Sequence, residues 1–286
     1  MNFKYLLHYF RYYQAQLELK GTGTTFSAIT QEIVRNIEIP VPSLSDQDSI
    51  ANRIEELFSE LDKGVETLFT IKQQLEVYRR AVLNEAFANC QTIKANEVCV
   101  HISDGDHMPP PKAKVGIPFV MISNIENNQI VWENTNFVDS IYYSRIGDKR
   151  TPRIGDVLYT VTGSFGIPVL VDFEKEFCFQ RHIALLRPSK RIGQRFLYYA
   201  LQSPNVLTQA THRATGTAQK TVGLSVLRDL DIPFEDDIQK QNIIVSRIDS
   251  QLSLCDSIVV TVNTALNQAE SMRKSILKQA FEGRLI

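Results

Sequence analysis

Apolar residues recur every seven positions between about residues 46 and 88, and this spacing constrains the fold more than any other feature of the sequence. One row of the repeat is Ile54, Leu61, Leu68, Leu75 and Val82, and a second row is Ile50, Leu57, Gly64, Ile71 and Tyr78. Two rows with this period are typical of a coiled-coil helix. We therefore expect residues 46 to 88 to form one long helix that pairs with another helix along this seam.

The partner is a copy of the same pattern later in the chain. A shift of 194 residues aligns the first row with Ile248, Cys255, Val262, Ala269 and Ile276. A shift of 193 aligns earlier segments: Phe3 to Leu6 match Phe196 to Tyr199, and Ile33 to Pro40 match Val226 to Pro233. The sequence therefore contains an internal repeat. Such a repeat favours two helices related by a pseudo-two-fold axis, although the seam alone does not fix their direction.

The repeat divides the chain into four parts. We expect a remnant of an upstream domain at residues 1–45, a first long helix at 46–88, a mixed α/β domain at 89–235, and a second long helix at 236–286. Strands are expected at residues 117–122, 156–162, 169–173 and 183–186, with a helix at 196–202. The alternating Ile37, Ile39 and Val41 suit a short edge strand, and Ser45 or Asp46 suits the N-cap of the first long helix. The fold class is α+β.

Composition excludes several classes of protein. The four cysteines form no CxxC pair, which argues against a zinc site and favours reduced thiols in a cytoplasmic protein. The first twenty residues mix aromatic and charged side chains and resemble neither a signal peptide nor a membrane span. The net charge of −1 does not point to nucleic acid.

The distribution of charge is more informative than its total. Residues 187–220 contain no Asp or Glu and six basic residues, namely Arg187, Lys190, Arg191, Arg195, Arg213 and Lys220. A run like this is most often a solvated face. Six positive charges without an acid also fit a surface that meets phosphate.

Three short motifs carry possible binding chemistry. Residues 160–166 (TVTGSFG) follow an expected strand and form either a hairpin-like turn or a hydroxyl-bearing loop that approaches a duplex backbone. Gln180, Arg181 and His182 interrupt apolar sequence, and Arg and Gln suit bidentate contacts with guanine and adenine. Residues 213–220 (RATGTAQK) form another polar loop.

Metal binding and catalysis have weaker support. His101, Asp104, Asp106 and His107 could suggest a metal site, but Asp104-Gly105 is a turn signal and such close ligands rarely reach tetrahedral geometry. The sequence has no Walker loop, GxSxG elbow, HExxH motif or amino-methyltransferase motif. We therefore expect no metal site and no catalytic residues in this chain.

Five stretches resemble the specificity (S) subunit of Type I restriction-modification systems: ISDGDHMPPP at 102–111, GIPFVMISNI at 116–125, GDVLYTVTGSFGIPVLV at 155–171, TGTAQKTVGLSVLRDLDIPFE at 215–235 and RKSILKQAFEGRLI at 273–286. The resemblance implies that residues 89–235 are a target recognition domain, reading one half of a split DNA sequence. It implies that the long helices form an antiparallel coiled coil that docks methyltransferase (M) subunits and, through them, restriction (R) subunits. Methylation and cleavage, with S-adenosylmethionine, ATP and Mg²⁺, would belong to those partners.

Candidate DNA-binding residues follow from this resemblance and from side-chain chemistry. Phosphate contacts are assigned to Lys112, Lys114, Lys190, Arg191, Arg213 and Lys220. Base discrimination is assigned to Ser164, Arg181, His182 and Gln219, with Thr162 and Thr217 in the same loops.

Family members of this kind hold two recognition domains, whereas this sequence shows one and the remnant of another. One hypothesis is a half-size subunit that forms a homodimer and reads a palindromic split site. The alternative is a truncated or cassette-derived coiled-coil interaction protein without independent DNA recognition.

Overall fold

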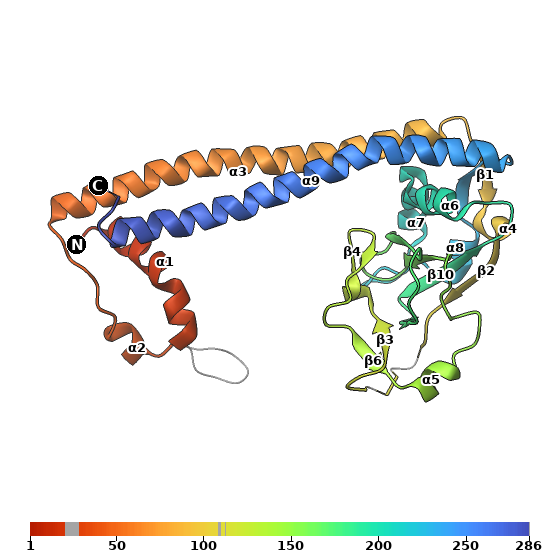
Figure 1. Cartoon of the computed structure of the whole chain (residues 1–286), viewed down its shortest axis with the longest axis horizontal. Coiled ribbons are helices and arrows are strands. Elements are labelled where there is room, and N and C mark those ends of the chain that lie inside the picture. The colour runs from red at the N-terminus through yellow and green to blue at the C-terminus, as the bar shows by residue number, and fades with distance from the viewer. Residues whose placement is uncertain (21–28, 108–109, 112, 286) are drawn as a thin grey trace. The chain divides into compact units, whose positions relative to one another are not determined.

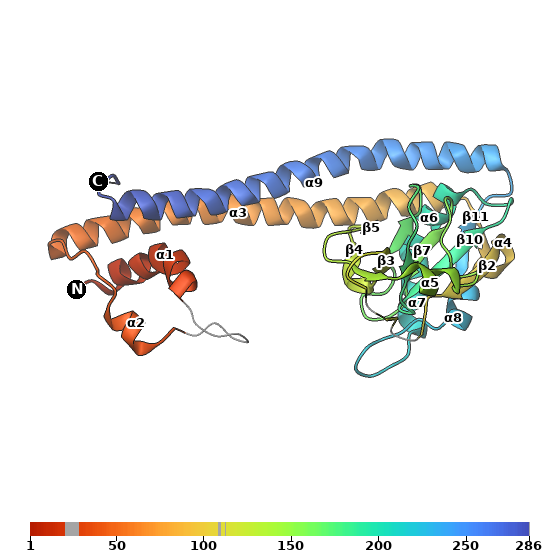
Figure 2. The same ribbon diagram turned by 60° about the horizontal axis from the view of Figure 1, so that its bottom comes forward.

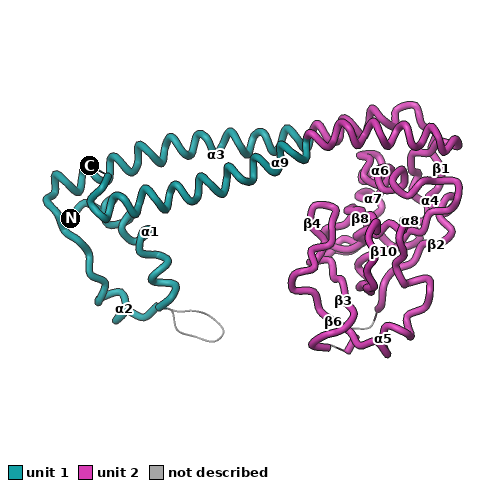
Figure 3. Tube along the Cα trace, viewed as in Figure 1, with its two compact units in different colours: residues 1–76, 255–286 teal, residues 77–254 magenta. Residues whose placement is uncertain are grey.

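The computed structural model describes residues 1–20, 29–107, 110–111 and 113–285. The chain divides into two compact units, each considered by itself below (Figure 3). Unit 1 comprises Met1–Glu76 and Cys255–Ile286, and unit 2 comprises Val77–Leu254.

Two helices of 44 residues each, α3 (Leu44–Phe87) and α9 (Ile238–Phe281), run side by side through both units (Figures 1 and 2). In unit 1, Lys72 Nζ lies 3.3 Å from Asn263 Oδ1, and Arg273 pairs with Asp62. Residue numbers therefore rise along α3 as they fall along α9, so the helices are antiparallel. In unit 2, the first-row positions Val82 and Ile248 are buried in one core cluster. The predicted fold class, with its antiparallel coiled coil, is confirmed.

Helix α3 begins earlier than expected. The Ser43 hydroxyl accepts a hydrogen bond from the Asp46 backbone N–H at 3.2 Å and donates to its carboxylate at 2.7 Å. Ser43 therefore caps the helix, and the predicted cap at Ser45 or Asp46 was wrong because those residues already lie in the first turn.

Unit 1 also holds α1 (Phe3–Lys20) and α2 (Gln31–Arg35). Tyr5 of α1 shares a buried cluster with Ile50 and Ile54 of α3 and Ala280 of α9. No strand forms at residues 37–41, so that prediction was wrong. The hydroxyls of Tyr5 and Tyr9 donate to carbonyls of this segment, but among the described residues no strand pairs with it.

The described residues of unit 2 form four small sheets. The central one is antiparallel, in the order β2 (Cys99–Asp104), β10 (Ile183–Pro188), β7 (Val157–Thr160) and β8 (Pro168–Leu170). A second joins β6 (Asn136–Val138), β3 (Ile117–Val120) and β9 (Cys178–Phe179), with β3 and β9 parallel. Two-stranded ladders join β1 (Gln91–Lys94) to β11 (Asp231–Phe234) and β4 (Ile125–Glu126) to β5 (Gln129–Ile130).

Unit 2 also holds short helices, namely α4 (Ala95–Val98), a 3-10 turn η1 (Ile122–Asn124), α5 (Ser140–Ser144), α6 (Gln194–Gln202), α7 (Pro204–Arg213) and α8 (Leu224–Arg228). The four strands expected from sequence correspond to β3, β7, β8 and β10, and the expected helix corresponds to α6. These predictions are confirmed, with shifts of a few residues at the ends.

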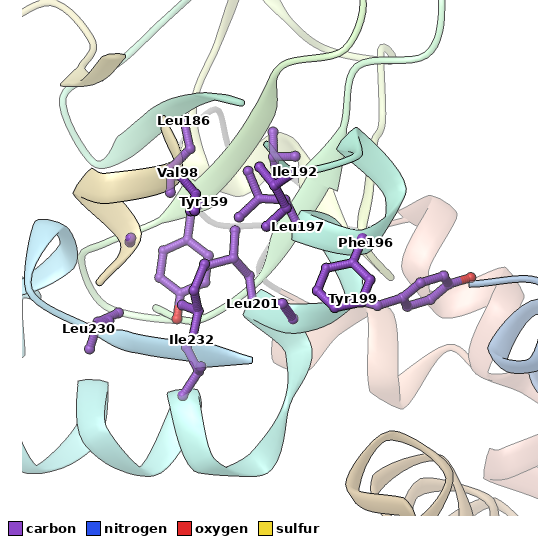
Figure 4. Packing of buried hydrophobic residues seen from close by; sticks show 14 of the residues in the cluster. Val98, Tyr159, Leu186, Ile192, Phe196, Leu197, Tyr199, Leu201, Leu230 and Ile232 are labelled. Atoms are coloured by element: carbon purple, nitrogen blue, oxygen red, sulfur yellow. The ribbon is translucent and has the colours of Figure 1, made fainter. Parts of the chain in front are cut away.

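The central sheet is buried on both faces. Because side chains alternate along a strand, Tyr159 of β7 and Leu186 of β10 point into one core cluster, whereas Leu158 and Leu185 point into another. Figure 4 shows Tyr159 and Leu186 beside Leu197 of α6. This two-sided burial explains the continuous apolar runs of β7 and β10. No helix among the described residues is long and apolar enough to cross a membrane.

Candidate nucleic-acid interface

Three polar segments meet where β7 ends and β10 begins: loop 161–167, turn 180–182 and loop 214–221. We call them the loop cluster. The Val161 N–H donates to the His182 carbonyl at 2.9 Å, and the Gly163 N–H donates to the Lys220 carbonyl at 2.9 Å. The Val222 N–H donates back to the Val161 carbonyl at 2.8 Å. Backbone hydrogen bonds therefore join three motifs that are up to 60 residues apart in sequence.

Loop 161–167 is a hydrogen-bonded hairpin connection between β7 and β8. The buried Thr160 hydroxyl donates to the Ser164 carbonyl at 2.8 Å and accepts from the Ile167 N–H at 2.9 Å. Gly166 has φ +92°, and a side chain there would lie 2.6 Å from Leu207 of α7. The hairpin is thus observed, and the exposed Ser164 lies near its tip.

Loop 214–221 is closed by reciprocal backbone bonds between Thr215 and Thr221, at 2.9 and 2.7 Å. Gly216 has φ +108°, and a side chain there would lie 2.3 Å from the Gln219 carbonyl oxygen, so the tight loop requires glycine. Thr217, Gln219 and Lys220 are exposed on it. In contrast, Thr162 is buried, and its hydroxyl lies 3.3 Å from that of Thr221, where it joins the two loops.

Turn 180–182 presents an exposed Arg181 and a half-buried His182. Burial, followed by the neighbouring Arg181 charge, lowers the pKa of His182, so its ring is neutral at pH 7 and offers one donor and one acceptor.

Sequence reasoning missed the support beneath this turn. The Asp106 N–H donates to the Phe179 carbonyl at 3.1 Å, and the Arg181 N–H donates to the Asp106 carbonyl at 3.0 Å. A side chain at Gly105 would lie 2.1 Å from the Phe179 carbonyl oxygen. The Tyr142 hydroxyl donates to the Asp106 carboxylate. The turn signal Asp104-Gly105-Asp106 could be identified in the sequence, but β9, the strand that this turn supports, was not predicted.

The contacts of residues 101–107 also bear on whether this segment binds a metal ion. Asp104 Oδ2 lies 2.6 Å from His107 Nε2, while Asp106 bonds Tyr142. Within the part of the chain that the structure describes, no group of three or more His, Cys, Asp or Glu residues is arranged to hold a metal ion.

In the folded chain, acidic side chains neutralise much of the positive charge of residues 187–220, which we call the basic window. Four of its six basic residues pair with acids from other parts of the sequence: Arg187 with Asp156, Arg191 with Asp236, Arg195 with Asp249 and Arg213 with Asp229. The Arg213 guanidinium, followed by Lys94, lowers the pKa of Asp229, so that pair stays charged. The window is therefore acid-free in sequence but not in space.

The candidate phosphate-binding residues do not gather at one place. Lys220 lies in the loop cluster, and Arg213 at the end of α7 leads into it. Lys190 and Arg191 follow the opposite end of β10, where the Arg191 carbonyl accepts from Gln241 of α9. Lys114 is exposed in the segment before β3, and Lys112 lies outside the described residues.

The sequence matches a known protein family. The family model described as "Type I restriction modification DNA specificity domain" matches residues 1–76 and 89–268. The EcoBI specificity subunit of Escherichia coli is 25% identical over 318 aligned residues, covering 99% of this chain and 66% of its own length. The MjaVIII specificity subunit of Methanocaldococcus jannaschii is 22% identical over 303, covering 98% and 70%. The chain thus spans about two thirds of the length of these relatives.

Solved structures agree on the fold. One solved structure concerns complex assembly and conformational transition of the type I R-M system. A chain of that structure superposes with a TM-score of 0.72 at 21% identity, and the match covers 98% of this chain and 71% of that one. The HsdS subunit from Thermoanaerobacter tengcongensis gives 0.52 at 21% identity, covering 98% and 70%. These identities support the shared fold alone.

Proposed function

The chain belongs to the Type I restriction modification DNA specificity family, and from this premise we propose that it is the DNA-reading subunit of a Type I restriction-modification complex. In this proposal residues 89–235 form the recognition domain, which reads one half of a split target. Residues 46–88 and 236–286 form the coiled coil, which docks M subunits and through them R subunits.

The observation that supports this proposal best is the loop cluster itself. Three sequence-distant segments place Ser164, Arg181 and Gln219 on loops joined by backbone hydrogen bonds. Serine, arginine and glutamine are side chains that read base edges, and bidentate Arg and Gln contacts distinguish guanine and adenine. A fixed loop lowers the entropy lost when such side chains bind, so these backbone hydrogen bonds favour sequence-specific reading.

Phosphate contacts supply the remaining affinity in this proposal. Lys220 is the strongest candidate because it lies within the loop cluster. Arg213 and Arg191 must first leave Asp229 and Asp236, at 2.7 and 3.4 Å, so their net contribution to binding is smaller. Thr217 and Lys114 add polar and positive groups on the same unit.

We propose no catalytic role for the chain. S-adenosylmethionine, ATP and Mg²⁺ are assigned to the partner subunits, and the complex is assigned to the cytoplasm, where its DNA target lies. Residues 1–45 are assigned to a second recognition unit that this sequence contains only in part. A second copy of the chain, related by a two-fold axis, is one source of a second reader and would give a palindromic split site.

The proposal is tested by methylome sequencing of cells that carry this chain with its M subunit. A methylated split sequence that depends on the chain supports the proposal. Methylation that is unchanged without the chain contradicts it.

Single substitutions then separate the two kinds of contact. On the identified target, Arg181→Ala should cost about 1–3 kcal/mol and relax one base position. Lys220→Ala should weaken binding to all duplexes alike and reduce the salt slope by about 1. Lys240→Ala is the matched control, because Lys240 is an exposed lysine on α9 beside Glu235, and binding should stay unchanged. Equal, sequence-independent losses for Arg181 and Lys220 would refute this division.

The second candidate function is a coiled-coil interaction protein without DNA recognition. The ion pairing of four basic residues in the window favours it, because paired cations attract phosphate less strongly. Such a protein would bind every duplex sequence equally and would not direct methylation to any site.

A further inference from the structure

Residues 145–153 (RIGDKRTPR), which lie between α5 and β7, form a strongly basic segment. They hold one acid, Asp148, and four cations, namely Arg145, Lys149, Arg150 and Arg153. The net charge of the segment is therefore +3. None of the candidate DNA-binding residues lies in it, so this charge has no role in the proposed function.

The acid within the segment neutralises one of its four cations. Asp148 is ion-paired with Arg153 at 3.0 Å. Arg145 and Lys149 are exposed, and neither forms an ion pair among the described residues. We call Arg145, Lys149 and Arg150 the basic strip. The strip keeps uncompensated positive charge, whereas four of the six cations in the basic window are paired with acids.

Hydrogen bonds from the central sheet hold the backbone of this segment. The Ser103 hydroxyl of β2 donates to the Lys149 carbonyl at 2.6 Å. The Arg187 guanidinium of β10 donates to the Thr151 carbonyl at 2.9 Å. A ligand contact made from an anchored backbone costs less conformational entropy than one made from a free segment. The strip is therefore held in advance of any ligand.

Contacts at the end of the edge strand β2 bring the basic strip next to the loop cluster. Asp104, the last residue of β2, lies 3.6 Å from Arg150. Two residues later, the Asp106 carboxylate accepts a hydrogen bond from the Tyr142 hydroxyl. The Asp106 carbonyl accepts from the Arg181 N–H at 3.0 Å. Turn 180–182 and the start of the basic segment therefore share the same support.

A neighbouring histidine responds to the positive charge of this region. Burial lowers the pKa of His101 on β2, and the charges of Lys149 and Arg187 lower it further. Cations disfavour the protonated form of a nearby ring for the same reason that they favour a nearby anion. The surroundings of the strip therefore suit a negatively charged ligand.

We propose that the basic strip is a phosphate-binding site of unit 2, which holds the backbone of a DNA duplex beside the base-reading loops. The inference rests on the proposed function, because the duplex that the loop cluster reads is the source of the phosphates. It deepens that function by placing phosphate contacts next to Arg181. Lys190 and Arg191, in contrast, follow the opposite end of β10.

The division of labour follows from the chemistry of the two surfaces. Contacts to phosphate set the position of a protein on the duplex but carry no sequence information. Arg181 offers the bidentate geometry that distinguishes bases. A phosphate held by the strip would fix the duplex relative to turn 180–182, since Asp106 joins the support of both.

The test measures how the affinity of the full chain for a DNA duplex depends on salt concentration. Each phosphate contact releases condensed counterions, so loss of one contact reduces the slope of log K against log salt by about 0.9. Arg145→Gln with Lys149→Gln should therefore reduce the slope by about 2. The reduction should be the same for duplexes of every sequence, because phosphates are common to all of them.

Lys63→Gln with Arg80→Gln is the matched control. It removes the same two charges from exposed positions of α3 that form no ion pair among the described residues. The salt slope of this control should equal that of the unsubstituted chain. Equal slopes for the strip variant and the control would overturn the proposal, because the effect would then be absent or due to net charge alone.

A charge-preserving variant separates binding from folding. Arg145→Lys with Lys149→Arg keeps both charges at the same positions and should retain the slope of the unsubstituted chain. A reduced slope in this variant would contradict a phosphate contact, which requires charge at these positions. Both strip variants should leave the midpoint of urea unfolding unchanged, because the two side chains are exposed.

The outcomes distinguish this inference from the proposed function. A chain that binds all duplexes equally, with a slope that falls in the strip variant, supports the strip and contradicts sequence reading. A chain that prefers one target, with a slope that does not fall, contradicts the strip alone. A chain that binds no duplex contradicts both.

Discussion

Replacement of Arg187 with methionine should destabilise unit 2 more than any other loss of a single surface charge. Arg187, near the end of β10, forms a bidentate pair with Asp156, just before β7, with both N–O distances 2.8 Å. It also donates to the Thr151 carbonyl at 2.9 Å. Because β7 and β10 bear two segments of the loop cluster at their other ends, this pair anchors the strands that position the loops.

The size of the effect follows from burial. Asp156 is 2% exposed and Arg187 is 18% exposed, and the hydrogen bond to Asp156 raises the pKa of Arg187. Removal of one partner leaves a buried carboxylate whose remaining contact is the Arg153 N–H at 2.8 Å, and such a loss costs about 3–5 kcal/mol. Arg191→Met is the matched control. Its pair with Asp236 spans 3.4 Å with side chains 52% and 73% exposed, so about 0–1 kcal/mol is expected.

Urea unfolding followed by the fluorescence of Trp132, the only tryptophan and part of unit 2, measures both variants. Replacement of both partners, with Asp156→Leu added to Arg187→Met, should recover much of the loss, because no uncompensated charge then remains buried. A cost for Arg187→Met no larger than that for Arg191→Met would refute the reasoning.

Three further predictions test other parts of the chain. Gly105→Ala should cost about 1–3 kcal/mol in urea unfolding, because its Cβ would lie 2.1 Å from a β9 carbonyl oxygen, whereas Gly147→Ala, with open space, should be neutral. Burial of His8, followed by the nearby Arg11 charge, lowers the pKa of His8 in the folded chain below its ordinary value of 6.5. On acidification the unfolded chain therefore takes up the proton at a higher pH than the folded chain, so the stability present above pH 6.5 should fall as the pH falls. His8→Phe should lessen this fall, measured as the melting temperature at several pH values. An Asp62–Arg273 double-mutant cycle should give a coupling of about 0–1 kcal/mol, because the Arg273 and Asp62 side chains are 34% and 60% exposed, and a coupling above about 2 kcal/mol would contradict this reasoning.

The long helices and the main strands were predictable because their signals are local. The heptad rows require only the period of a helix, and the buried first-row residues Ile54, Val82 and Ile248 confirm it. The second row was less reliable: Gly64 and Tyr78 are exposed, whereas Phe58, one position after the second-row Leu57, is buried. The seven-residue period predicts the buried face of each long helix approximately, whereas tertiary packing decides which residues of each row are buried.

The site was only partly predictable because its contacts are non-local. The loops of the cluster were identified by their polar residues, but nothing in the sequence shows that Gly163 bonds Lys220. The charge balance of residues 187–220 was not predictable for the same reason, since the acid that pairs with Arg195 lies 54 residues away at Asp249. The assignment of individual residues to bases or phosphates remains a prediction.

The internal repeat reaches only part of the loop cluster. In unit 2, loop 214–221 follows helices α6 and α7, but two backbone contacts, Gly163 to Lys220 and Val222 to Val161, depend on the loop between β7 and β8. The sequence copy of loop 214–221, which includes Thr22-Gly23-Thr24, lies outside the described residues. The repeat therefore accounts for the helices beside the loop cluster, whereas the contacts that hold loop 214–221 come from the sheet, which the repeat does not include.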